Sequence, residues 1–304
     1  MAEAKIIWQI SDGKRGHENQ SAGLIDALSQ HLDVKTVKID LAEHKASWLH
    51  AFKGQFPFAK EHSKPDLIIG TGSRTHSTIL AAGRATNTPT IVIMAPPRGL
   101  TKLFDLCIVP EHDNRKGANI LTTKGAMNRI RPSDTKDLSS GLFLVGGPSQ
   151  HHDWDETKLL EQINTILDTE EATKWTLTTS RRTPSSTTAK LQAIDHPRLT
   201  VIPVDNTSET WLPETLATAS LVWATEDSVS MVYEALSSGA KVGLLPGIRK
   251  TGQSRVLTGL DTLIKEAYLL PFTADQTNLN EFKNPPALNE AKRIAKCIVA
   301  RYFQ

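Results

Sequence analysis

Residues 221–246 read LVWATEDSVSMVYEALSSGAKVGLLP, and this stretch has the order strand, loop, helix, strand. The runs LVWAT (221–225) and KVGLLP (241–246) are short and continuously apolar, which is typical of parallel strands buried on both faces. Between them we expect a helix that begins near Ser228 and ends at Gly239, because glycine commonly terminates helices. The stretch therefore predicts a β-α-β unit of an α/β protein.

The same alternation of apolar runs and helical patterns continues through most of the chain. Further strands are expected at residues 5–10, 34–40, 66–70, 90–95, 106–112, 141–147, 174–180 and 199–205, and helices at 21–32, 73–85 and 154–167. A polar stretch, RPSDTKDLSS (131–140), interrupts this rhythm before it restarts. The sequence thus predicts the α/β class with two Rossmann-like domains, residues 1–135 and residues 136–304.

Composition excludes some classes of protein. The chain has 304 residues, of which 39% are hydrophobic and 22% charged, as in soluble globular proteins. Its net charge of +2 is too balanced to favour a nucleic-acid partner. No run reaches the ~20 apolar residues of a membrane span, and we expect no signal peptide. Cys107 and Cys297 lie in apolar surroundings and are predicted to be buried thiols in a reducing compartment, so the expected location is the cytoplasm.

Ligands of parallel α/β sheets bind beyond the carboxyl ends of the strands, so the strand-to-helix loops are candidate sites. The first such loop is SDGKRGHENQ (11–20). Histidine is the residue type that ordinarily changes charge closest to neutral pH, so His17 is a candidate general base, while Asp12 or Glu18 could act instead or orient it. The ordinary alternative is that His17 caps a helix beginning near Glu18. The remaining candidates for substrate binding in this loop are Gly13, Lys14, Arg15, Gly16 and Asn19.

Two loops in the second half carry further candidates. Gly146, Gly147 and Ser149 follow the strand at 141–147. Arg181 and Arg182 follow the strand at 174–180, and arginine pairs well with phosphate oxygens. The acids of Asp153-Trp154-Asp155 have the spacing of a metal-binding pair, but a helix cap at Asp153 or Asp155 is the favoured interpretation.

The loop inside the opening stretch is the richest in polar residues. Glu226 or Asp227 can cap the helix, and Ser228 and Ser230 can receive a phosphate at its positive end. Glu234, one turn beyond Ser230, could accept two hydroxyl hydrogens from a ribose. The predicted substrate-binding residues of this loop are Thr225, Glu226, Asp227, Ser228, Ser230, Met231 and Glu234.

Several of these motifs occur together in a known family. The segments DGKRGHENQSAGL (12–24), PEHD (110–113), VGGPS (145–149) with HHDW (151–154), TTSRRTP (178–184) and TEDSVSM (225–231) resemble the plant mitochondrial fission factors of the elongated-mitochondria type. Bacterial members of that family are often labelled as nucleoside-diphosphate-sugar epimerases. The pattern S-x-S-M-x-x-E-A (228–235) also resembles the nucleotide-binding helix of GT-B glycosyltransferases.

The resemblance implies two Rossmann-like domains facing a central cleft. It implies an acceptor side in the first domain, a sugar-nucleotide side in the second, and a last helix, near residues 287–303, that packs back on the first domain. It implies no metal and no cofactor, the nucleoside-diphosphate sugar being the substrate.

Three functions remain open. The first is a metal-independent glycosyltransferase that moves a sugar to a cell-envelope glycan or lipid acceptor, with Lys250 and Arg255 helping the arginines to stabilise the departing diphosphate. The second is a non-hydrolysing nucleoside-diphosphate-sugar epimerase. The third is a non-catalytic binding protein or membrane-fission adaptor, the role in which plant members recruit a membrane-division machine.

The segment ASWLHAFKGQFPFAK (46–60) bears on a membrane partner. Its aromatic and aliphatic residues stand among lysines, which suits the inner face of a membrane. The alternative is a connection packed into the core, and both interpretations stay open. The apolar residues are Trp48, Leu49, Phe52, Phe56 and Phe58, and the lysines are Lys45, Lys53 and Lys60.

Overall fold

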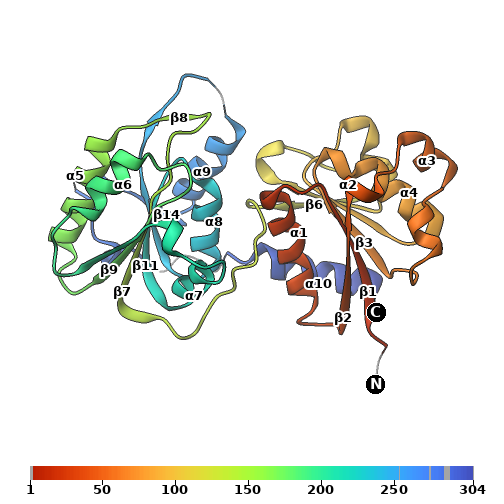
Figure 1. Cartoon of the computed structure of the whole chain (residues 1–304), viewed down its shortest axis with the longest axis horizontal. Coiled ribbons are helices and arrows are strands. Elements are labelled where there is room, and N and C mark those ends of the chain that lie inside the picture. Colours follow the sequence, from red (N-terminus) through yellow and green to blue (C-terminus); the bar gives the residue numbers. More distant parts are fainter. Residues whose placement is uncertain (1–2, 253, 274, 284–287, 304) are drawn as a thin grey trace. The chain divides into compact units, whose positions relative to one another are not determined.

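A computed structural model describes residues 3–252, 254–273, 275–283 and 288–303, apart from the side chain of Arg255. The chain divides into two compact units (Figure 1). Unit 1 is Met1–Arg129 together with Glu290–Gln304, and unit 2 is Ile130–Asn289. The division at residues 129 and 130 lies close to the polar stretch at which the sequence rhythm restarts.

Unit 1 is built on a parallel sheet in the order β2-β1-β3-β4-β5-β6. Its strands are β1 (Lys5–Ser11), β2 (Val34–Asp40), β3 (Leu67–Thr71), β4 (Thr90–Ile93), β5 (Leu106–Pro110) and β6 (Ile120–Thr123). The central strands β3 and β4 are buried along their whole length, as expected for strands covered on both faces. Every carboxyl end of this sheet therefore lies at one edge.

Helices cover both faces of the unit 1 sheet. They are α1 (Arg15–Leu28), α2 (Leu41–His44), α3 (Trp48–Lys53), α4 (His76–Thr86) and α10 (Glu290–Tyr302), with short turns η1 (Pro57–Lys60), η2 (Ser73–Thr75), η3 (Arg98–Leu103) and η4 (Glu111–Asp113). Leu24 of α1 and Ile294 of α10 share one core cluster with Ile7 of β1. Trp8, the next residue of β1, points to the opposite cluster with Leu80 of α4. The alternation along β1 thus assigns one helix layer to each face.

The last helix, α10, completes unit 1. It packs beside α1 (Figure 1), and Ile294, Ala295 and Ile298 are fully buried. The carboxylate of Glu290 accepts a hydrogen bond from the backbone N–H of Lys124 at 2.9 Å. The prediction that the last helix packs back on the first domain is therefore confirmed.

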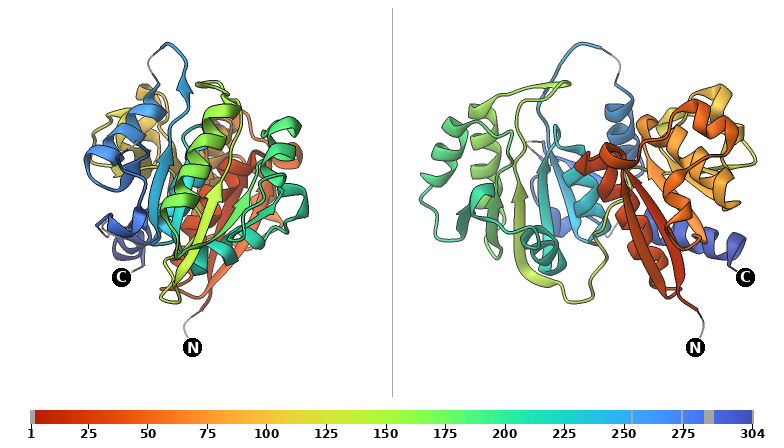
Figure 2. Two further views of the ribbon diagram at one scale, coloured as in Figure 1. Left: turned by 90° about the vertical axis from the view of Figure 1, so that its left-hand side faces the viewer. Right: turned by 45° about the vertical axis from the view of Figure 1, so that its right-hand side comes forward.

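Unit 2 has a second parallel sheet, in the order β10-β9-β7-β11-β12-β14, with helices on both faces (Figure 2). The strands are β7 (Asp137–Leu144), β9 (Lys174–Thr178), β10 (Leu199–Ile202), β11 (Ala219–Thr225), β12 (Lys241–Leu245) and β14 (Leu269–Pro271). The helices are α5 (Glu156–Thr169), α6 (Ser185–Gln192), α7 (Trp211–Thr218), α8 (Val229–Ser237) and α9 (Arg255–Lys265), with turns η5 (Val204–Asn206) and η6 (Leu279–Glu281). A small antiparallel pair joins β8 (His152–Asp153) to β13 (Ile248–Arg249). This strand order is that of dinucleotide-binding Rossmann folds, so the predicted fold class is confirmed.

Two local predictions and one alternative interpretation were wrong. Helix α1 begins at Arg15 rather than near Glu18, so His17 lies inside its first turn and is not its cap. The predicted helix at 73–85 is divided, because a tight η2 turn at Ser73–Thr75 precedes α4. Cys107 is buried as predicted, but Cys297 is exposed because it lies on the outer face of α10. None of the helices in the described part of the chain is long and apolar enough to cross a membrane.

Candidate functional site

The first group of polar residues lies beyond the carboxyl end of β1. The Asp12 side chain, which is only 1% exposed, has its carboxylate 3.0 Å from Nδ1 of His17. Its other oxygen accepts the backbone N–H of Lys14 at 3.2 Å. A buried carboxylate in this position makes Nδ1 the protonated ring nitrogen. Among the described residues His17 Nε2 has no hydrogen-bond partner, so its lone pair is available as a base.

The His17 ring is also held from its other side. It lies against Gly72, which follows β3 and has a positive φ of 83°. A Cβ at Gly72 would stand 2.5 Å from Cε1 of His17, well inside van der Waals contact. Only glycine leaves room for the ring here, and the two carboxyl-end loops of β1 and β3 together fix its orientation.

Glu18 lies in the same turn of α1 but is engaged differently. Lys38 of β2 forms an ion pair with its carboxylate at 2.7 Å, and the Ser11 hydroxyl also donates to it. The hydrogen bonds from Lys38 and then Ser11 lower the pKa of Glu18. A carboxylate with a lowered pKa is a weaker base, so the geometry favours His17 over Glu18 for proton removal.

The other predicted residues of this loop surround the Asp12–His17 pair at the start of α1. Gly13, Lys14, Arg15 and Gly16 are exposed, and Asn19 is half-buried. Gly13 takes a positive φ of 74°, which turns the chain from β1 into α1. The structure thus gathers all the predicted residues of 11–20 in the loop beyond β1 and the first turns of α1.

A second candidate site is a pocket of about 540 Å³ within unit 2. It contains five of the predicted residues, namely Ser149, Arg182, Asp227, Ser228 and Ser230. Its lining includes the first residues of α8, and no side chain in the described part of the chain caps that helix. The uncapped N–H groups and the helix dipole favour an anion at this end. The prediction that Glu226 or Asp227 caps α8 was therefore wrong.

Asp227 is fully engaged within this pocket wall. It forms an ion pair with Arg182 at 2.7 Å and accepts the N–H of Gly147 at 3.0 Å. Arg182 also donates to the carbonyl of Gly147 at 3.0 Å. A Cβ at Gly146 would lie 2.2 Å from the Asp227 carboxylate, and one at Gly147 2.1 Å from the Arg182 carbonyl. The two glycines are therefore required for close packing of this wall.

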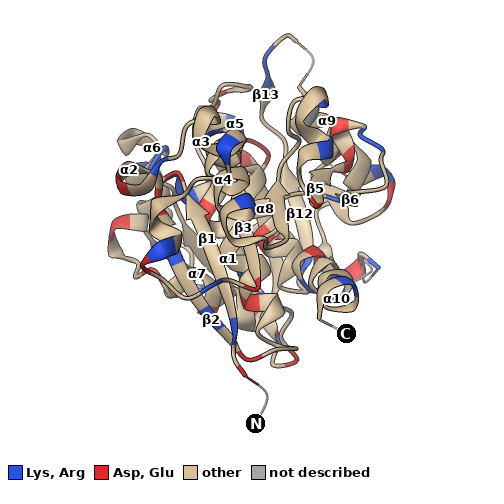
Figure 3. Cartoon of the chain, turned by 90° about the vertical axis from the view of Figure 1, so that its right-hand side faces the viewer, with Lys and Arg blue, Asp and Glu red and all other residues tan. Residues whose placement is uncertain are grey.

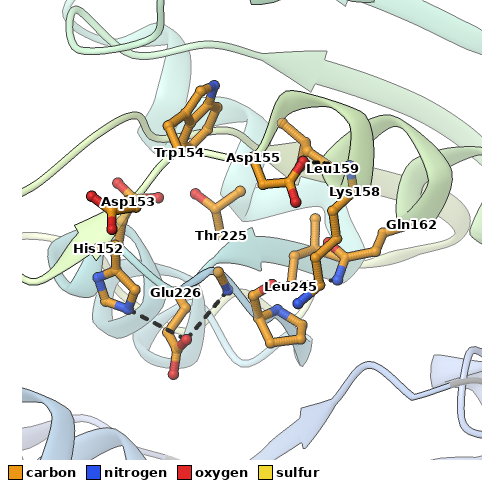
Figure 4. Close-up of a pocket in the computed structure, with 13 residues that line it drawn as sticks. His152, Asp153, Trp154, Asp155, Lys158, Leu159, Gln162, Thr225, Glu226 and Leu245 are labelled. Atoms are coloured by element: carbon orange, nitrogen blue, oxygen red, sulfur yellow. Dashed lines mark hydrogen bonds and ion pairs between the residues drawn. The ribbon is translucent and has the colours of Figure 1, made fainter. Parts of the chain in front are cut away.

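Glu226 belongs to a separate buried network (Figure 4). One of its oxygens lies 3.3 Å from Nε2 of His152, an ion-pair distance, and this nitrogen has no hydrogen-bond partner among the described residues. The other oxygen accepts from Arg249, which also pairs with Asp261. The cavity beside these side chains measures about 20 Å³, which is room for one water and no more. Glu226 thus joins β11 to the β8–β13 pair.

The remaining predicted residues lie outside the 540 Å³ pocket. Thr225 accepts the N–H of Gly146 at 2.8 Å and is buried. Arg181 is exposed, whereas Met231 and Glu234 are half-buried on α8. Lys250 reaches the pocket wall by donating to the Ser149 carbonyl at 3.1 Å. The predicted contribution of Arg255 falls on a side chain outside the described residues.

The two acids with metal-binding spacing have other partners. Asp155 caps α5 by accepting the N–H of Lys158 at 3.0 Å, which confirms the capping interpretation. Asp153 lies 3.4 Å from Lys250. Within the described residues no group of three or more His, Cys, Asp or Glu side chains is placed to hold a metal ion.

Sequence reasoning missed some residues of these sites. Gly72 was not among the predicted site residues, although it packs against the His17 ring. Gln150, His151, Val256 and Leu257 line the unit 2 pocket and were not predicted. Val256 and Leu257 come from α9, which follows β13, and nothing in the local pattern marks them as pocket residues.

Comparison with known proteins places this geometry in a family. A model of the family described as mitochondrial fission ELM1 matches residues 15–302. The chain belongs to this family. An uncharacterized protein of Rickettsia prowazekii (strain Madrid E) is 22% identical to this ELM1-family chain over 349 residues, covering 96% of this chain and 97% of the relative.

Solved structures resemble the ELM1-family chain in fold. UDP-GlcNAc 2-epimerase from Neisseria meningitidis, bound to UDP-GlcNAc, superimposes with a TM-score of 0.58 at 12% identity, covering 98% of this chain and 100% of that one. The glycosyltransferase SnogD from Streptomyces nogalater gives a TM-score of 0.52 at 11% identity, covering 99% and 96%. The GT-B-like fold expected from the sequence is thus confirmed.

The ELM1 match includes most of the candidate residues. It begins at Arg15, so His17 and Glu18 lie inside the matched segment while Asp12 precedes it. All residues that line the unit 2 pocket are inside it as well.

Proposed function

We propose that this protein is a metal-independent glycosyltransferase that moves a sugar from a nucleoside-diphosphate sugar to an acceptor hydroxyl. The observation that carries the proposal is the Asp12–His17 pair. A buried carboxylate 3.0 Å from Nδ1, with Nε2 unpartnered among the described residues, is the arrangement of an oriented general base. A histidine held by a carboxylate in this way suits proton transfer.

The proposed reaction uses His17 to activate the acceptor. Nε2 takes the proton of the acceptor hydroxyl as its oxygen attacks the anomeric carbon of the donor sugar. The bond from that carbon to the diphosphate oxygen breaks, and the diphosphate leaves with the electron pair. Asp12 would stabilise the imidazolium that forms, because its carboxylate already accepts the Nδ1 proton.

The nucleotide is assigned to the unit 2 pocket. Its volume of about 540 Å³ suits a small ligand, and the uncapped start of α8 supplies N–H donors for a phosphate. Lys250, which is half-exposed beside Ser149, adds a positive charge. A uridine-diphosphate sugar is the first donor to test, since a solved protein of the same fold holds UDP-GlcNAc. The proposed ribose contact of Glu234 remains part of this assignment.

The acceptor is proposed to be a cell-envelope glycan or lipid. Support comes from α3, where Trp48, Leu49 and Phe52 are 50%, 60% and 81% exposed. Apolar side chains on one short helix, close in sequence to Lys45 and Lys53, suit contact with a membrane face that carries such acceptors.

The test starts from donor binding. Thermal shift against a panel of uridine and other nucleoside-diphosphate sugars should identify the donor, and radiolabelled sugar from that donor should then enter a lipid extract. His17→Gln should keep the thermal shift and lose transfer. If His17→Gln transfers sugar as fast as the unchanged protein, His17 is not the base. EDTA should leave the rate unchanged.

A second candidate is a nucleoside-diphosphate-sugar epimerase, favoured by the likeness in fold to UDP-GlcNAc 2-epimerase. Epimerisation needs no acceptor, so the donor alone would then be converted to its epimer, which NMR detects. Donor binding with neither conversion nor transfer would favour the third possibility, a binding protein or membrane-fission adaptor.

A further inference from the structure

Unit 1 contains a second cavity, distinct from the Asp12–His17 pair. It has a volume of about 610 Å³ and lies between the η3 segment and the loop that precedes β6. We call it the basic groove, defined by Arg98, Lys102, Arg115 and Lys116 above the apolar side chains of Phe104 and Ile120. Figure 3 shows basic residues, coloured blue, on the segment beside β5 and β6.

The charge of the basic groove is unbalanced. No acidic residue lines it, and none of its four basic side chains has an ion-pair partner among the described residues. Other basic residues of unit 1 do have such partners, for example Lys38 with Glu18 and Arg129 with Asp26. The nearby Asp105 is turned away, because its carboxylate accepts from Thr90 at 2.8 Å. Like charges gathered in one concave surface attract an anionic ligand.

The two walls of the groove are tied to each other. The Asn119 amide donates to the carbonyl of Thr101 at 2.9 Å and to that of Phe104 at 2.8 Å. The backbone carbonyl of Asn119 in turn accepts the backbone N–H of Cys107 at 2.8 Å. These bonds join the loop before β6 to the segment before β5. The basic side chains therefore stand on a fixed frame, which lowers the entropic cost of binding.

The groove is separate from the proposed catalytic group. Its walls precede β5, which begins at Leu106, and β6, which begins at Ile120, so they lie toward the amino ends of these strands. His17 follows the carboxyl end of β1, and the sheet is parallel. The two features therefore belong to opposite edges of one sheet.

We propose that the basic groove binds a small ligand that carries a diphosphate group. Four positive charges match the two or three negative charges of a diphosphate, and arginine pairs well with phosphate oxygens. The volume lies in the range of small-molecule sites. Phe104 and Ile120 provide an apolar floor for the group attached to the diphosphate. The basic groove belongs to unit 1, whereas the proposed donor pocket belongs to unit 2.

The experiment is calorimetric titration of the whole chain with inorganic pyrophosphate. All measurements use a Ser230→Glu background, in which an added carboxylate repels pyrophosphate from the unit 2 pocket. In that background Arg115→Gln with Lys116→Gln should weaken binding about tenfold or more. The control pair, Lys35→Gln with Lys64→Gln, removes the same charge from exposed positions of unit 1 and should change affinity less than about twofold.

The outcomes separate this proposal from the proposed function. Equal weakening by both pairs, or no pyrophosphate binding in the Ser230→Glu background, would overturn the basic groove as a diphosphate site and leave the donor pocket unaffected. If the groove pair alone weakens binding, two further ligands identify the source of the diphosphate. Tighter binding of citronellyl diphosphate than of pyrophosphate indicates an isoprenoid ligand, and tighter binding of ADP indicates a nucleotide.

Discussion

The carboxylate of Asp12 is 3.0 Å from Nδ1 of His17, and its side chain is almost completely buried. Asp12→Asn preserves the shape of this contact but replaces the carboxylate by an amide. The amide no longer fixes the tautomer of the His17 ring. We expect kcat for sugar transfer to fall roughly 100-fold or more while donor affinity holds. Nitrogen-15 NMR of the His17 ring provides a measurement that needs no substrate. Unchanged ring shifts in Asp12→Asn would contradict the assigned role of Asp12.

Alanine variants at Gly72 and Gly13 distinguish two effects. One is loss of the contact that positions the His17 ring, and the other is strain of the backbone. Both have positive φ, so alanine is strained at either position, and more strongly at Gly72, whose ψ of 165° lies in a region that is essentially restricted to glycine. Only the Cβ at Gly72 collides with His17, whereas the Cβ at Gly13 meets nothing within 4 Å. Gly72→Ala should therefore displace the ring and alter its NMR titration, and Gly13→Ala should not. Identical titrations of His17 in the two variants would show that Gly72 does not position it.

Arg249 stabilises unit 2 through its buried partner. Arg249→Met leaves the Glu226 carboxylate, whose side chain is 3% exposed, without its cation, and we expect a loss of about 3 kcal/mol. Asp261→Asn removes the other partner of Arg249. The Asp261 side chain is 52% exposed, so this change should cost less than about 1 kcal/mol. Urea unfolding followed by circular dichroism compares the two. Equal losses would mean that burial of Glu226 does not decide the energy.

The aromatic residues of the 46–60 segment have separate tasks. Phe56 and Phe58 are buried against Trp8, so Phe56→Asp would damage the core and cannot test membrane contact. Phe52→Ser is the informative variant, and Leu138→Ser is its control, because Leu138 is equally exposed at 82% in unit 2. Sedimentation with vesicles containing phosphatidylglycerol should fall for Phe52→Ser alone. Equal sedimentation of both variants would remove the case for a membrane face at α3.

Lys136 makes the free energy of unfolding depend on pH in the alkaline range. Burial lowers the pKa of Lys136 to about 8, while its ammonium donates to the Leu216 carbonyl at 2.6 Å. The folded chain thus loses this proton at lower pH than the unfolded chain, whose lysine keeps its ordinary pKa near 10.4. Between these values the unfolded state binds more protons, so the contribution of Lys136 to stability rises with pH. Lys136→Gln should lack this rise when unfolding free energies at pH 7 and pH 10 are compared. If the free energy of unfolding rises by the same amount in Lys136→Gln, other groups cause the rise.

The sequence predicted the two sheets and the place of the candidate sites because both follow from local patterns. Continuous apolar runs identified the strands, and the rule that ligands lie beyond their carboxyl ends directed attention to Asp12, His17 and Ser228. In the structure Asp12 lies in such a loop, His17 lies in the first turn of the helix that follows it, and Ser228 directly precedes α8.

Partners distant in sequence explain what local patterns could not predict. Glu226 was expected to cap α8, but it is bound to Arg249, 23 residues away, and that ion pair outweighs a local cap. The 46–60 segment has both buried and exposed aromatic residues. Only packing against Trp8 separates the buried Phe56 from the exposed Phe52.

The return of α10 to unit 1 has a consequence for synthesis on the ribosome. Ile294 and Ile298 fill the same core cluster as Ile7 and Leu24, although the whole of unit 2 is translated between them. At the usual rate of translation, the intervening residues 130–289 take roughly ten to thirty seconds to emerge. During that interval the hydrophobic surface that awaits α10 stays exposed. Unit 2 can therefore finish folding before unit 1, and a nascent chain stalled before residue 290 should be a preferred client of chaperones.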